Sequence, residues 1–310
     1  MKILLLGANG QVGHELIRAL TSLGEVVVAT RNGELADGTP CLPADLSDTA
    51  SLAAALDAAD ARVIVNAAAY TAVDRAEDEA SLADRINHRA VGEIGTWAAR
   101  HAALVVHYST DYVFDGTATR PWRESDPTAP LGVYGRTKLD GEHALRVSGA
   151  SHLIFRTAWV YAARGHNFLR TMLRLAAERE ELRVVADQIG APTPARWIAD
   201  TTATALALWC ESHARADLGG VYHLTAAGHG SWCDFATAIV QGAARRGLLA
   251  RAARVMPIAT ADYPTPAQRP AYSVLDCMRL KNAFGLELHD WRVGVDEVLD
   301  EVAAQVEGTG

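Results

Sequence analysis

Tyr134 and Lys138 stand four positions apart in the run Val-Tyr-Gly-Arg-Thr-Lys, residues 133–138. On a helix, residues at this spacing share one face, so a phenol and an ammonium would lie side by side. A free tyrosine has a pKa of about 10 and is a poor acid–base catalyst near neutrality, whereas a nearby cation favours the phenolate. The pair therefore indicates proton transfer at a substrate oxygen, although the same spacing also occurs by chance in many helices.

A glycine-rich turn at the N-terminus could supply the cofactor that such a reaction needs. Residues 2–6 predict a short buried strand that runs into Gly7, Gly10 and Gly13, with a helix beginning near Gln11. Glycines let the backbone approach a pyrophosphate, and the helix start points N–H groups and its positive dipole end at the phosphates. The spacing is Gly-x-x-Gly-x-x-Gly, and its place after a first strand favours dinucleotide binding over a purely structural crossover.

Arg31 suggests which dinucleotide binds. It follows the next predicted strand, residues 25–30, at the point where an acidic residue would bind the adenosine ribose hydroxyls. A guanidinium there can instead hold a ribose 2′-phosphate bidentately, so we expect NADPH, with NADH as the alternative. An ordinary solvated arginine is the competing interpretation.

Other strand ends should meet at the same edge of the sheet. Asp45 could bond the adenine amino group, although Ser47 or Asp48 could serve only as a helix cap. The strand at residues 62–66 ends in Ala67, Ala68 and Ala69, which leave room for a flat cofactor or simply allow close packing. A long helix is then expected over residues 79–100, with Leu82, Ile86, Ile94 and Ala98 in the core.

Thr110 completes a catalytic constellation with Tyr134 and Lys138. It ends the predicted strand 104–108 beside the same crevice, where its hydroxyl could orient and polarise a carbonyl. A hydride would arrive from the nicotinamide, Tyr134 would protonate the carbonyl oxygen, and Lys138 would also hold the nicotinamide ribose. These elements predict a dehydrogenase or reductase with an α/β fold, a Rossmann-type doubly wound parallel sheet and a smaller interleaved α/β lobe that binds the substrate.

Seven runs of the chain resemble the dTDP-4-dehydrorhamnose reductases, a family of extended short-chain dehydrogenases/reductases. The resemblance implies reduction of the 4-keto group of dTDP-4-dehydro-L-rhamnose to dTDP-L-rhamnose, a donor for lipopolysaccharide and other cell-surface polysaccharides. The glycine turn and the Tyr/Lys pair are shared across the superfamily, whereas the other runs are more specific. The runs are residues 7–13, 65–74, 106–114, 133–138, 153–161, 187–193 and 263–270.

The resemblance also implies roles for individual residues, with Tyr134 as the proton donor. Together with the reasoning above, it gives the expected cofactor contacts as Gly7, Gly10, Gln11, Val12, Gly13, Arg31, Asp45, Leu46, Ala67, Ala68, Ala69, Tyr70, Thr71, Tyr108, Tyr134 and Lys138. The expected substrate contacts are Val73, Thr110, Asp111, Trp159, Asn167, Gln188 and Arg269.

The later substrate contacts each have a structural alternative. Trp159 could pack on a deoxysugar face or lie in the core. Arg269, between Pro266 and Pro270, suits a loop that closes over a nucleotide diphosphate, but could be a surface arginine. Asn167 and Gln188 are expected to meet thymine or phosphate. Trp209, Trp232 and Trp291 are expected in the core or an interface, and residues 119–130 in a loop.

Magnesium is the least certain partner. Some members of the resembled family bind Mg2+ at a dimer contact through a glutamate that matches Glu15 and a second one that here is replaced by Arg196. An arginine among the oxygen ligands repels a hard cation. We therefore expect no metal-bridged dimer, while a homodimer of another kind stays open.

Composition constrains the remaining possibilities. The chain has 310 residues, a net charge of −8 and no convincing linker, so we expect residues 1–150 mainly to bind the cofactor and residues 151–310 mainly to bind the sugar nucleotide, with crossings between them. The net charge gives no sign of nucleic-acid binding. The N-terminal apolar run is too short for a signal peptide or membrane span. Scattered cysteines at 41, 210, 233 and 277 favour reduced thiols in a cytoplasmic protein.

Three other functions fit the same residues. The chain could reduce another 4-keto deoxysugar nucleotide, because only the shape of the pocket separates such substrates. It could be a nucleotide-sugar epimerase or dehydratase, which keeps its nicotinamide bound and regenerates it in each cycle. It could also be a non-catalytic regulatory subunit resembling the methionine adenosyltransferase beta subunit, although Thr110, Tyr134 and Lys138 together favour an active enzyme.

Overall fold

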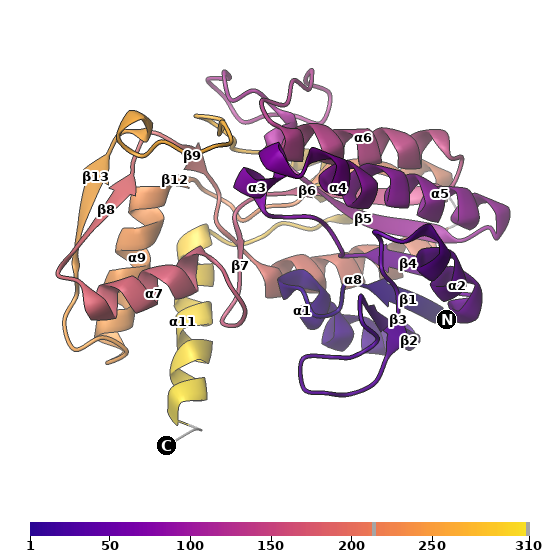
Figure 1. Ribbon diagram of the computed structural model, residues 1–310, viewed down its shortest axis with the longest axis horizontal. Helices are drawn as coiled ribbons and strands as arrows, with labels where there is room; N and C mark the ends of the chain where they lie inside the picture. The colour runs from indigo at the N-terminus through magenta and orange to yellow at the C-terminus, as the bar shows by residue number, and fades with distance from the viewer. Residues whose placement is uncertain (213–214, 308–310) are drawn as a thin grey trace.

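The computed structural model describes residues 1–212 and 215–307, arranged as a large sheet-centred part and a smaller lobe (Figure 1). The large sheet is parallel, and its strands lie in the order β11-β6-β5-β4-β1-β2-β3. Because the order reverses beside β1, the sheet is doubly wound, as predicted. Its strands are β1 (Lys2–Leu6), β2 (Glu25–Thr30), β3 (Leu42–Pro43), β4 (Val63–Asn66), β5 (Leu104–Thr110), β6 (Ser151–Thr157) and β11 (Gly220–His223).

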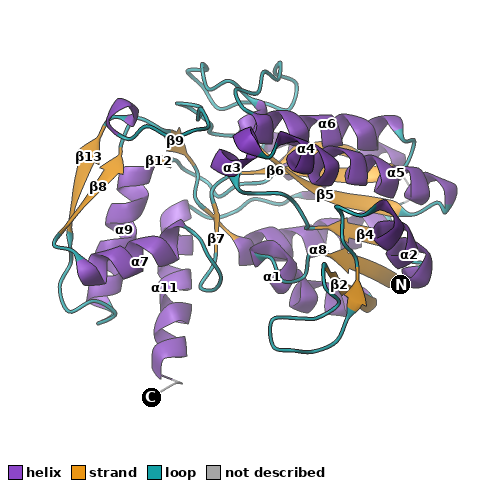
Figure 2. Ribbon diagram, viewed as in Figure 1, coloured by secondary structure: helices purple, strands orange, loops and turns teal. Residues whose placement is uncertain are grey.

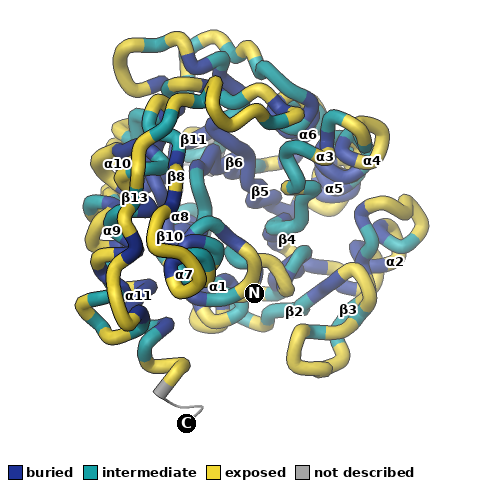
Figure 3. Tube along the Cα trace, turned by 60° about the vertical axis from the view of Figure 1, so that its left-hand side comes forward, coloured by how far each residue is buried: buried dark blue, intermediate teal, exposed yellow. Residues whose placement is uncertain are grey.

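Helices cover both faces of this sheet and bury it completely at its centre. The β1 segment Ile-Leu-Leu-Leu, residues 3–6, is fully buried, as a parallel strand packed on two sides requires. On one face lie α1 (Gln11–Leu20), α8 (Ala195–Glu211) and α10 (Met278–Phe284). On the other lie α2 (Thr49–Ala59), α5 (Ala90–Arg100) and α6 (Val133–Val147). Figure 3 shows the buried strands inside a shell of exposed loops.

The helix expected over residues 79–100 is interrupted. The structure has α4 (Ala80–Asp84), a π-helical turn η2 (Arg85–Arg89) and then α5, after a preceding α3 (Val73–Asp78). The wider turn places Asn87 inward, where its amide accepts from the backbone nitrogen of Tyr70 at 2.8 Å and donates to the carbonyl of Tyr70 at 3.0 Å. Leu82 in α4 is 40% exposed, so its assignment to the core was wrong.

The smaller lobe is a separate α/β layer built on its own apolar core (Figure 2). Strands β8 (Glu181–Val185) and β13 (Arg254–Ile258) pair in parallel, and α7 (Phe168–Glu178), α9 (Trp232–Arg245) and α11 (Trp291–Glu307) pack beside them. Two short pairs connect the lobe to the rest: β7 (Val160–Tyr161) with β10 (Thr193–Pro194), and β9 (Ile189–Gly190) with β12 (Gly230–Ser231). Short 3-10 turns lie at η1 (Thr21–Leu23), η3 (Asp111–Val113), η4 (Arg215–Leu218) and η5 (Thr260–Asp262).

The chain crosses between the two parts more than once. Strands β6 and β11 and helices α8 and α10 all lie beyond residue 150 in sequence yet pack in or against the large sheet. That residues 1–150 mainly bind the cofactor and residues 151–310 mainly bind the sugar nucleotide therefore stays a prediction. None of the four cysteines forms a disulfide, and residues 119–130 form a loop, as expected. No helix within residues 1–212 and 215–307 is long and apolar enough to cross a membrane.

Candidate active site

A cleft of about 540 Å³ lies along the carboxyl ends of the parallel strands. Sheets of this type bind ligands at that edge, where the strand order reverses. Most of the predicted cofactor contacts line the cleft, while Gly13 and Tyr70 lie outside its lining. The predicted residues in the lining are Gly7, Gly10, Gln11, Val12, Arg31, Asp45, Leu46, Ala67, Ala68, Ala69, Thr71, Tyr108, Tyr134 and Lys138.

The three glycines of the N-terminal turn are needed for different reasons. Gly7 has φ +81°, and a Cβ there would lie 2.5 Å from the backbone nitrogen of Ala68. A Cβ on Gly13 would collide with the carbonyl of Gly7, so this glycine allows α1 to pack on the turn. A Cβ on Gly10 would lie 3.2 Å from the Gly7 carbonyl oxygen and 4.0 Å from that of Ala67. The first contact is tight but no clash, and Gly10 lines the cleft, so its missing side chain also leaves room there.

Tyr70 turns away from the predicted nicotinamide pocket. Its hydroxyl donates to Glu79 at 2.6 Å, and this hydrogen bond raises the pKa of the phenol. The ring packs against the apolar clusters on the α5–α6 face of the sheet. The expected cofactor contact by this side chain is therefore not found, because a carboxylate on the neighbouring turn holds the phenol.

Arg31 is exposed at the cleft, close to the turn formed by Asp45. The Asp45 carboxylate accepts from the backbone nitrogen of Ser47 at 2.8 Å and from its hydroxyl at 2.7 Å. Partial burial raises the pKa of Asp45, but these hydrogen bonds and the positive charges of Arg31 and Arg85 lower it overall. Asp48 caps α2 by accepting from Ala50 at 2.9 Å, which confirms the capping alternative for that residue.

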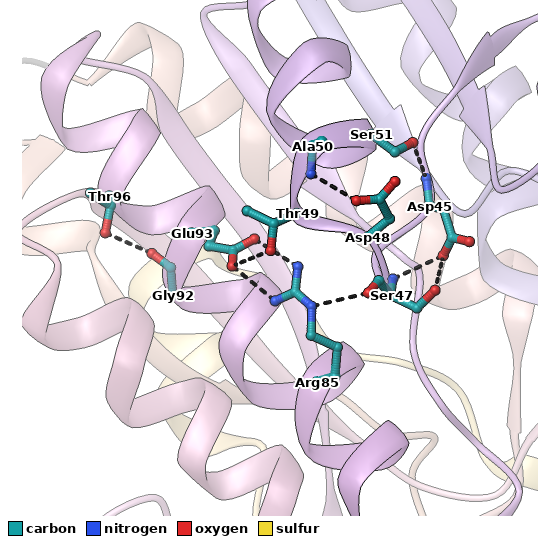
Figure 4. Close-up of polar contacts among 10 residues, drawn as sticks. All are labelled: Asp45, Ser47, Asp48, Thr49, Ala50, Ser51, Arg85, Gly92, Glu93 and Thr96. Atoms are coloured by element: carbon teal, nitrogen blue, oxygen red, sulfur yellow. Dashed lines mark hydrogen bonds and ion pairs between the residues drawn. The ribbon is translucent and has the colours of Figure 1, made fainter.

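Arg85 braces this turn from the other side (Figure 4). Its guanidinium makes two 2.9 Å hydrogen bonds to the carboxylate of Glu93, and its Nε donates to the carbonyl of Ser47 at 3.3 Å. A bidentate pair of this kind fixes geometry as well as charge. The π-helical turn that carries Arg85 is therefore tied to the turn formed by Asp45 at the rim of the cleft.

Lys138 shares a helical face with Tyr134 on α6 but bonds to the strand beneath it. Its Nζ donates to the carbonyl oxygen of Tyr108 at 2.5 Å and lies 3.4 Å from Nε2 of His107. Burial lowers the pKa of Lys138 to about 8, with Glu142 opposing the change.

Tyr134 does not have the lowered pKa that its spacing from Lys138 suggested. Burial raises the pKa of Tyr134 to about 12, a hydrogen bond with Thr110 offsets part of the rise, and the charge of Asp111 adds to it. The expectation failed because the ammonium of Lys138 turns to β5 and because desolvation of the phenol outweighs the remaining interactions. The phenol consequently keeps its proton at neutral pH.

Tyr134 lies on a shared wall between two cavities. It lines the large cleft and also a small pocket whose other walls include Val73, Tyr112 and Pro270. The ring of Tyr112 meets that of Tyr134 edge-on, with centroids 5.9 Å apart. The small pocket has a volume of about 10 Å³, which is room for about one water molecule, so a group bound in the cleft is what would reach this phenol here.

Thr110 and Asp111 adjoin Tyr134 at the end of β5. Both are buried, and the Thr110 hydroxyl donates to the Asp111 carboxylate at 3.0 Å. Burial raises the pKa of Asp111 to about 6, while hydrogen bonds from Ser273 and Thr110 limit the rise. The structure thus brings together Thr110, Asp111, Tyr134 and Val73, and their contact with a substrate stays a prediction.

Arg269 does not present a free guanidinium to the cleft. It forms a bidentate pair with Asp74 at 3.0 and 2.8 Å, and also donates to the hydroxyl of Thr265 at 2.6 Å. The hydrogen bond from Arg269 is the main reason that the pKa of Asp74 is lowered, against partial burial. In this structure Arg269 ties its proline-rich loop to α3, which explains its placement without a diphosphate.

Asn167 and Gln188 also have structural partners instead of lining the cleft. Asn167 caps α7 by accepting from Arg170 at 3.0 Å, and its amide donates to Gln11 at 2.8 Å and to the carbonyl of Ala162 at 2.9 Å. The side chain of Gln188 donates to the hydroxyl of Thr260 at 3.0 Å. Both substrate contacts stay predictions, because in this structure these polar side chains bond to protein groups.

Trp159 packs within the smaller lobe. Its ring stacks on Trp232 with centroids 3.6 Å apart, and a Cβ on Gly190 would lie 2.5 Å from its indole. The backbone of Trp159 has φ +47°, a conformation that costs a non-glycine residue on the order of 1–3 kcal/mol. The core alternative accounts for the indole, as it does for the fully buried Trp291.

Several cleft residues escaped the sequence reasoning. Arg164 and His166 lie on the loop after β7, facing the glycine turn, and Asn167 anchors this loop to Gln11. Their signal was the Arg-Gly-His run at a strand's carboxyl end, but no spacing rule connects it to residues 150 positions earlier. The others are Asn9, Thr30, Asn32, Ala44, Ile86, Ser109, Thr157, Val160 and Gly165.

Two places in the structure bring together residue types that can bind a metal: the surface around Glu15, and the cluster of Asp84, His88 and Asp140. Burial and Glu301 raise the pKa of Glu15, while Arg18 and Arg196 lower it. Both arginines also approach Asp200, so cations already occupy this surface. Asp84, His88 and Asp140 bring ligand atoms within 4.8 Å of one another, but Asp84 already binds Arg89 at 2.7 Å.

Comparison with known proteins gives one consistent result. Residues 1–304 match the family described as RmlD substrate binding domain. The chain is 51% identical to a dTDP-4-dehydrorhamnose reductase of Burkholderia thailandensis, over 98% of this chain and all of the relative. A dTDP-4-dehydrorhamnose reductase from Clostridium acetobutylicum superposes with a TM-score of 0.86 at 34% identity, covering 97% of this chain and 99% of that one. The reductase of Bacillus anthracis, solved in complex with NADP, gives 0.84 at 31% identity, with 97% and 100% covered.

Proposed function

The chain belongs to the RmlD substrate binding domain family and to the dTDP-4-dehydrorhamnose reductases within it, and we propose that it reduces the 4-keto group of dTDP-4-dehydro-L-rhamnose to give dTDP-L-rhamnose. It is an NAD(P)H-dependent oxidoreductase, and NADPH is the proposed reductant. The observation that carries the proposal is the position of Tyr134, a partly buried and protonated phenol between the long cleft and the small pocket.

The cleft fits a dinucleotide on its own residues. The open side of Gly10 and the N-terminus of α1 suit a pyrophosphate, and Ala67, Ala68 and Ala69 offer a flat wall beside it. Arg31 supports the choice of NADPH, because it is exposed at the adenosine end of the cleft. The cofactor, when bound, supplies a hydride to the carbonyl carbon.

Tyr134 would deliver the proton that accompanies this hydride. Because its pKa lies near 12, the phenol carries a proton at neutral pH and can donate it to the oxygen that gains charge. The hydroxyl of Thr110 lies beside the phenol and would orient the same oxygen. Lys138, when protonated, would place a positive charge near this oxygen, and it would contact the nicotinamide ribose. Asp111 and Val73 would border the sugar.

The sugar nucleotide would bind between the small pocket and the smaller lobe, with residues 1–150 mainly serving the cofactor. Arg269 and Trp159 would contact the sugar nucleotide only in a state in which their present partners, Asp74 and Trp232, have shifted. This division follows the position of Tyr134 at the boundary of the two cavities.

The test is to supply dTDP-4-dehydro-L-rhamnose, generated in situ, and to follow NADPH and NADH oxidation separately. We expect one cofactor oxidised for each dTDP-L-rhamnose formed, with NADPH preferred. An epimerase or dehydratase would convert substrate without net cofactor consumption, and a regulatory subunit would do neither. No turnover with either cofactor refutes the proposal, and faster turnover of another 4-keto deoxysugar nucleotide would reassign the substrate.

A further inference from the structure

A buried chain of three polar side chains lies directly beneath the cleft. Asn66, at the end of β4, is 1% exposed, His107 on β5 is 0% exposed and Lys138 on α6 is 2% exposed. The amide nitrogen of Asn66 lies 3.2 Å from Nδ1 of His107, and Nε2 of His107 lies 3.4 Å from Nζ of Lys138. The proposed mechanism uses the lysine but gives no role to the other two residues.

The direction of this chain is set at its first member. The side-chain oxygen of Asn66 accepts from the backbone nitrogen of Ala68 at 3.2 Å, and a backbone amide can only donate. The other end of the Asn66 side chain is therefore its NH2 group, which donates to Nδ1 of His107. A neutral imidazole that accepts at Nδ1 carries its proton on Nε2. His107 thus presents a donor to Lys138.

This direction distinguishes the two protonation states of Lys138. An ammonium has three donors and no acceptor, so it cannot bond to an Nε2–H group. A neutral amine has a lone pair and can accept that hydrogen while still donating to the carbonyl of Tyr108. The contact at 3.4 Å is longer than the usual range of about 2.7–3.2 Å, so a hydrogen bond here is a weak one.

Other charged and titratable groups surround Lys138, and Glu142 among them opposes the effect of burial on its pKa. Glu142, four residues later on α6, raises the pKa of Lys138, but is itself held by Arg156 of β6 at 2.9 and 2.7 Å. Tyr134 lies on the same face of α6, with Asp111 beyond it. The phenol of Tyr108 donates away from this site, to Thr202. Burial lowers the pKa values of both Lys138 and His107.

We infer that Asn66 and His107 are positioning residues that hold a hydrogen-bond donor against Lys138 and so stabilise its neutral amine. Lys138 would then exchange its proton within the working pH range instead of serving as a permanent charge. Its remaining N–H groups are left for the carbonyl of Tyr108 and for the cleft. The catalytic consequence rests on the proposed function, whereas the hydrogen-bond direction does not.

Nitrogen NMR on the full chain tests the direction without any substrate. In protein labelled with 15N-histidine, the resonances of His107 are those missing from the spectrum of His107→Leu. We expect a proton on Nε2 and an unprotonated Nδ1 across neutral pH. A proton on Nδ1, or a charged imidazole at pH 7, would overturn the inference. Asn66→Asp offers only acceptors, so it should move the proton to Nδ1.

The lysine can be followed directly, because the chain has only Lys2, Lys138 and Lys281. With 13C-labelled lysine, the wild-type Lys138 should titrate near pH 8, below the ordinary value of about 10.4. His107→Leu should raise this midpoint by about one pH unit, since it removes the donor that favours the neutral amine. If burial alone set the midpoint, the more apolar leucine would leave it unchanged or lower it, and that result contradicts the inference.

Folding and the proposed function are checked separately. His107→Leu leaves the NH2 of Asn66 without its acceptor, so its thermal melt must show a folded protein before titration. The wild-type spectrum decides the tautomer even if this variant fails to fold. Because neither readout needs turnover, an inactive wild-type enzyme would refute the proposed function and leave the NMR result standing.

Discussion

Nζ of Lys138 lies 2.5 Å from the backbone carbonyl oxygen of Tyr108. This bond joins the middle of α6 to the end of β5, the two elements that carry Tyr134 and Thr110. The lysine therefore fixes the spacing between the proposed proton donor and its neighbouring hydroxyl, in addition to carrying charge.

Lys138→Met should separate catalysis from stability. The variant removes a buried charge together with one hydrogen bond, so we expect the free energy of unfolding to change by less than about 2 kcal/mol. NADPH oxidation should fall by at least about 100-fold, because the charge near the reacting oxygen is lost. Urea unfolding and steady-state kinetics measure the two effects. Activity within a few fold of wild type would exclude Lys138 from the chemistry.

Tyr134→Phe should retain cofactor binding and lose turnover. The phenyl ring preserves the wall between the cleft and the small pocket, and only the proton donor is removed. We expect kcat to fall by about 100-fold or more, with the Kd for NADPH within a few fold of wild type. Tyr112→Phe is the matched control on the neighbouring ring. Equal losses in the two variants would contradict a specific role for Tyr134.

Arg31→Ala should weaken NADPH much more than NADH. A charge-assisted hydrogen bond to the 2′-phosphate contributes about 1.5–3 kcal/mol, which corresponds to roughly 10- to 100-fold in affinity. Binding titrations with both cofactors measure the ratio. An equal effect on both cofactors would make Arg31 a surface residue without a role in cofactor choice.

The buried pair of Arg156 and Glu142 should be expensive to break. Its side chains are 5% and 1% exposed, and Ser109 donates to the same carboxylate at 2.5 Å. Arg156→Met leaves a buried carboxylate without its cation, so we expect a loss of about 3–5 kcal/mol in the free energy of unfolding. Arg174→Ala breaks an exposed pair with Glu178 and should cost less than about 0.5 kcal/mol. Comparable losses in the two variants would contradict this account.

Asp111 should make stability depend on pH. Burial raises its pKa to about 6 in the folded chain, from an ordinary value near 3.8. The folded state then binds the proton more tightly than the unfolded state, so this group's contribution is fully present below pH 3.8 and is lost as the pH rises through 6. Asp111→Asn removes the dependence. Its stability relative to wild type should therefore improve by on the order of 2 kcal/mol between pH 4 and pH 7, as urea unfolding can measure. An unchanged difference would contradict the raised pKa.

The sheet and its cofactor edge could be predicted because local rules decide them. The continuous apolar runs at 3–6 and 104–106 lie in buried parallel strands, and the glycine turn must follow the first of them. The π-helical turn at 85–89 could not be predicted, because apolar periodicity does not show an extra residue in a helical turn. The turn accompanies the bonding of Asn87 to Tyr70, a contact across 17 positions.

The substrate side was predicted less well, because polar residues there have more than one possible partner. Arg269 pairs with Asp74, and Asn167 hydrogen-bonds to Gln11. These partners are 195 and 156 positions apart in the sequence. The spacing of Tyr134 and Lys138 correctly predicted that both lie on one face of α6. It did not predict that the ammonium of Lys138 points to the carbonyl of Tyr108. Side-chain direction depends on the strand beneath the helix, which the helical spacing does not describe.

The proposed hydride transfer can be observed directly with NADPH deuterated at the transferable position of its nicotinamide. Incubation with dTDP-4-dehydro-L-rhamnose should give dTDP-L-rhamnose with one deuterium at C4, in amounts equal to the NADPH consumed. Tyr134→Phe should form little of this product. An unlabelled product, or conversion without NADPH consumption, would contradict the central claim.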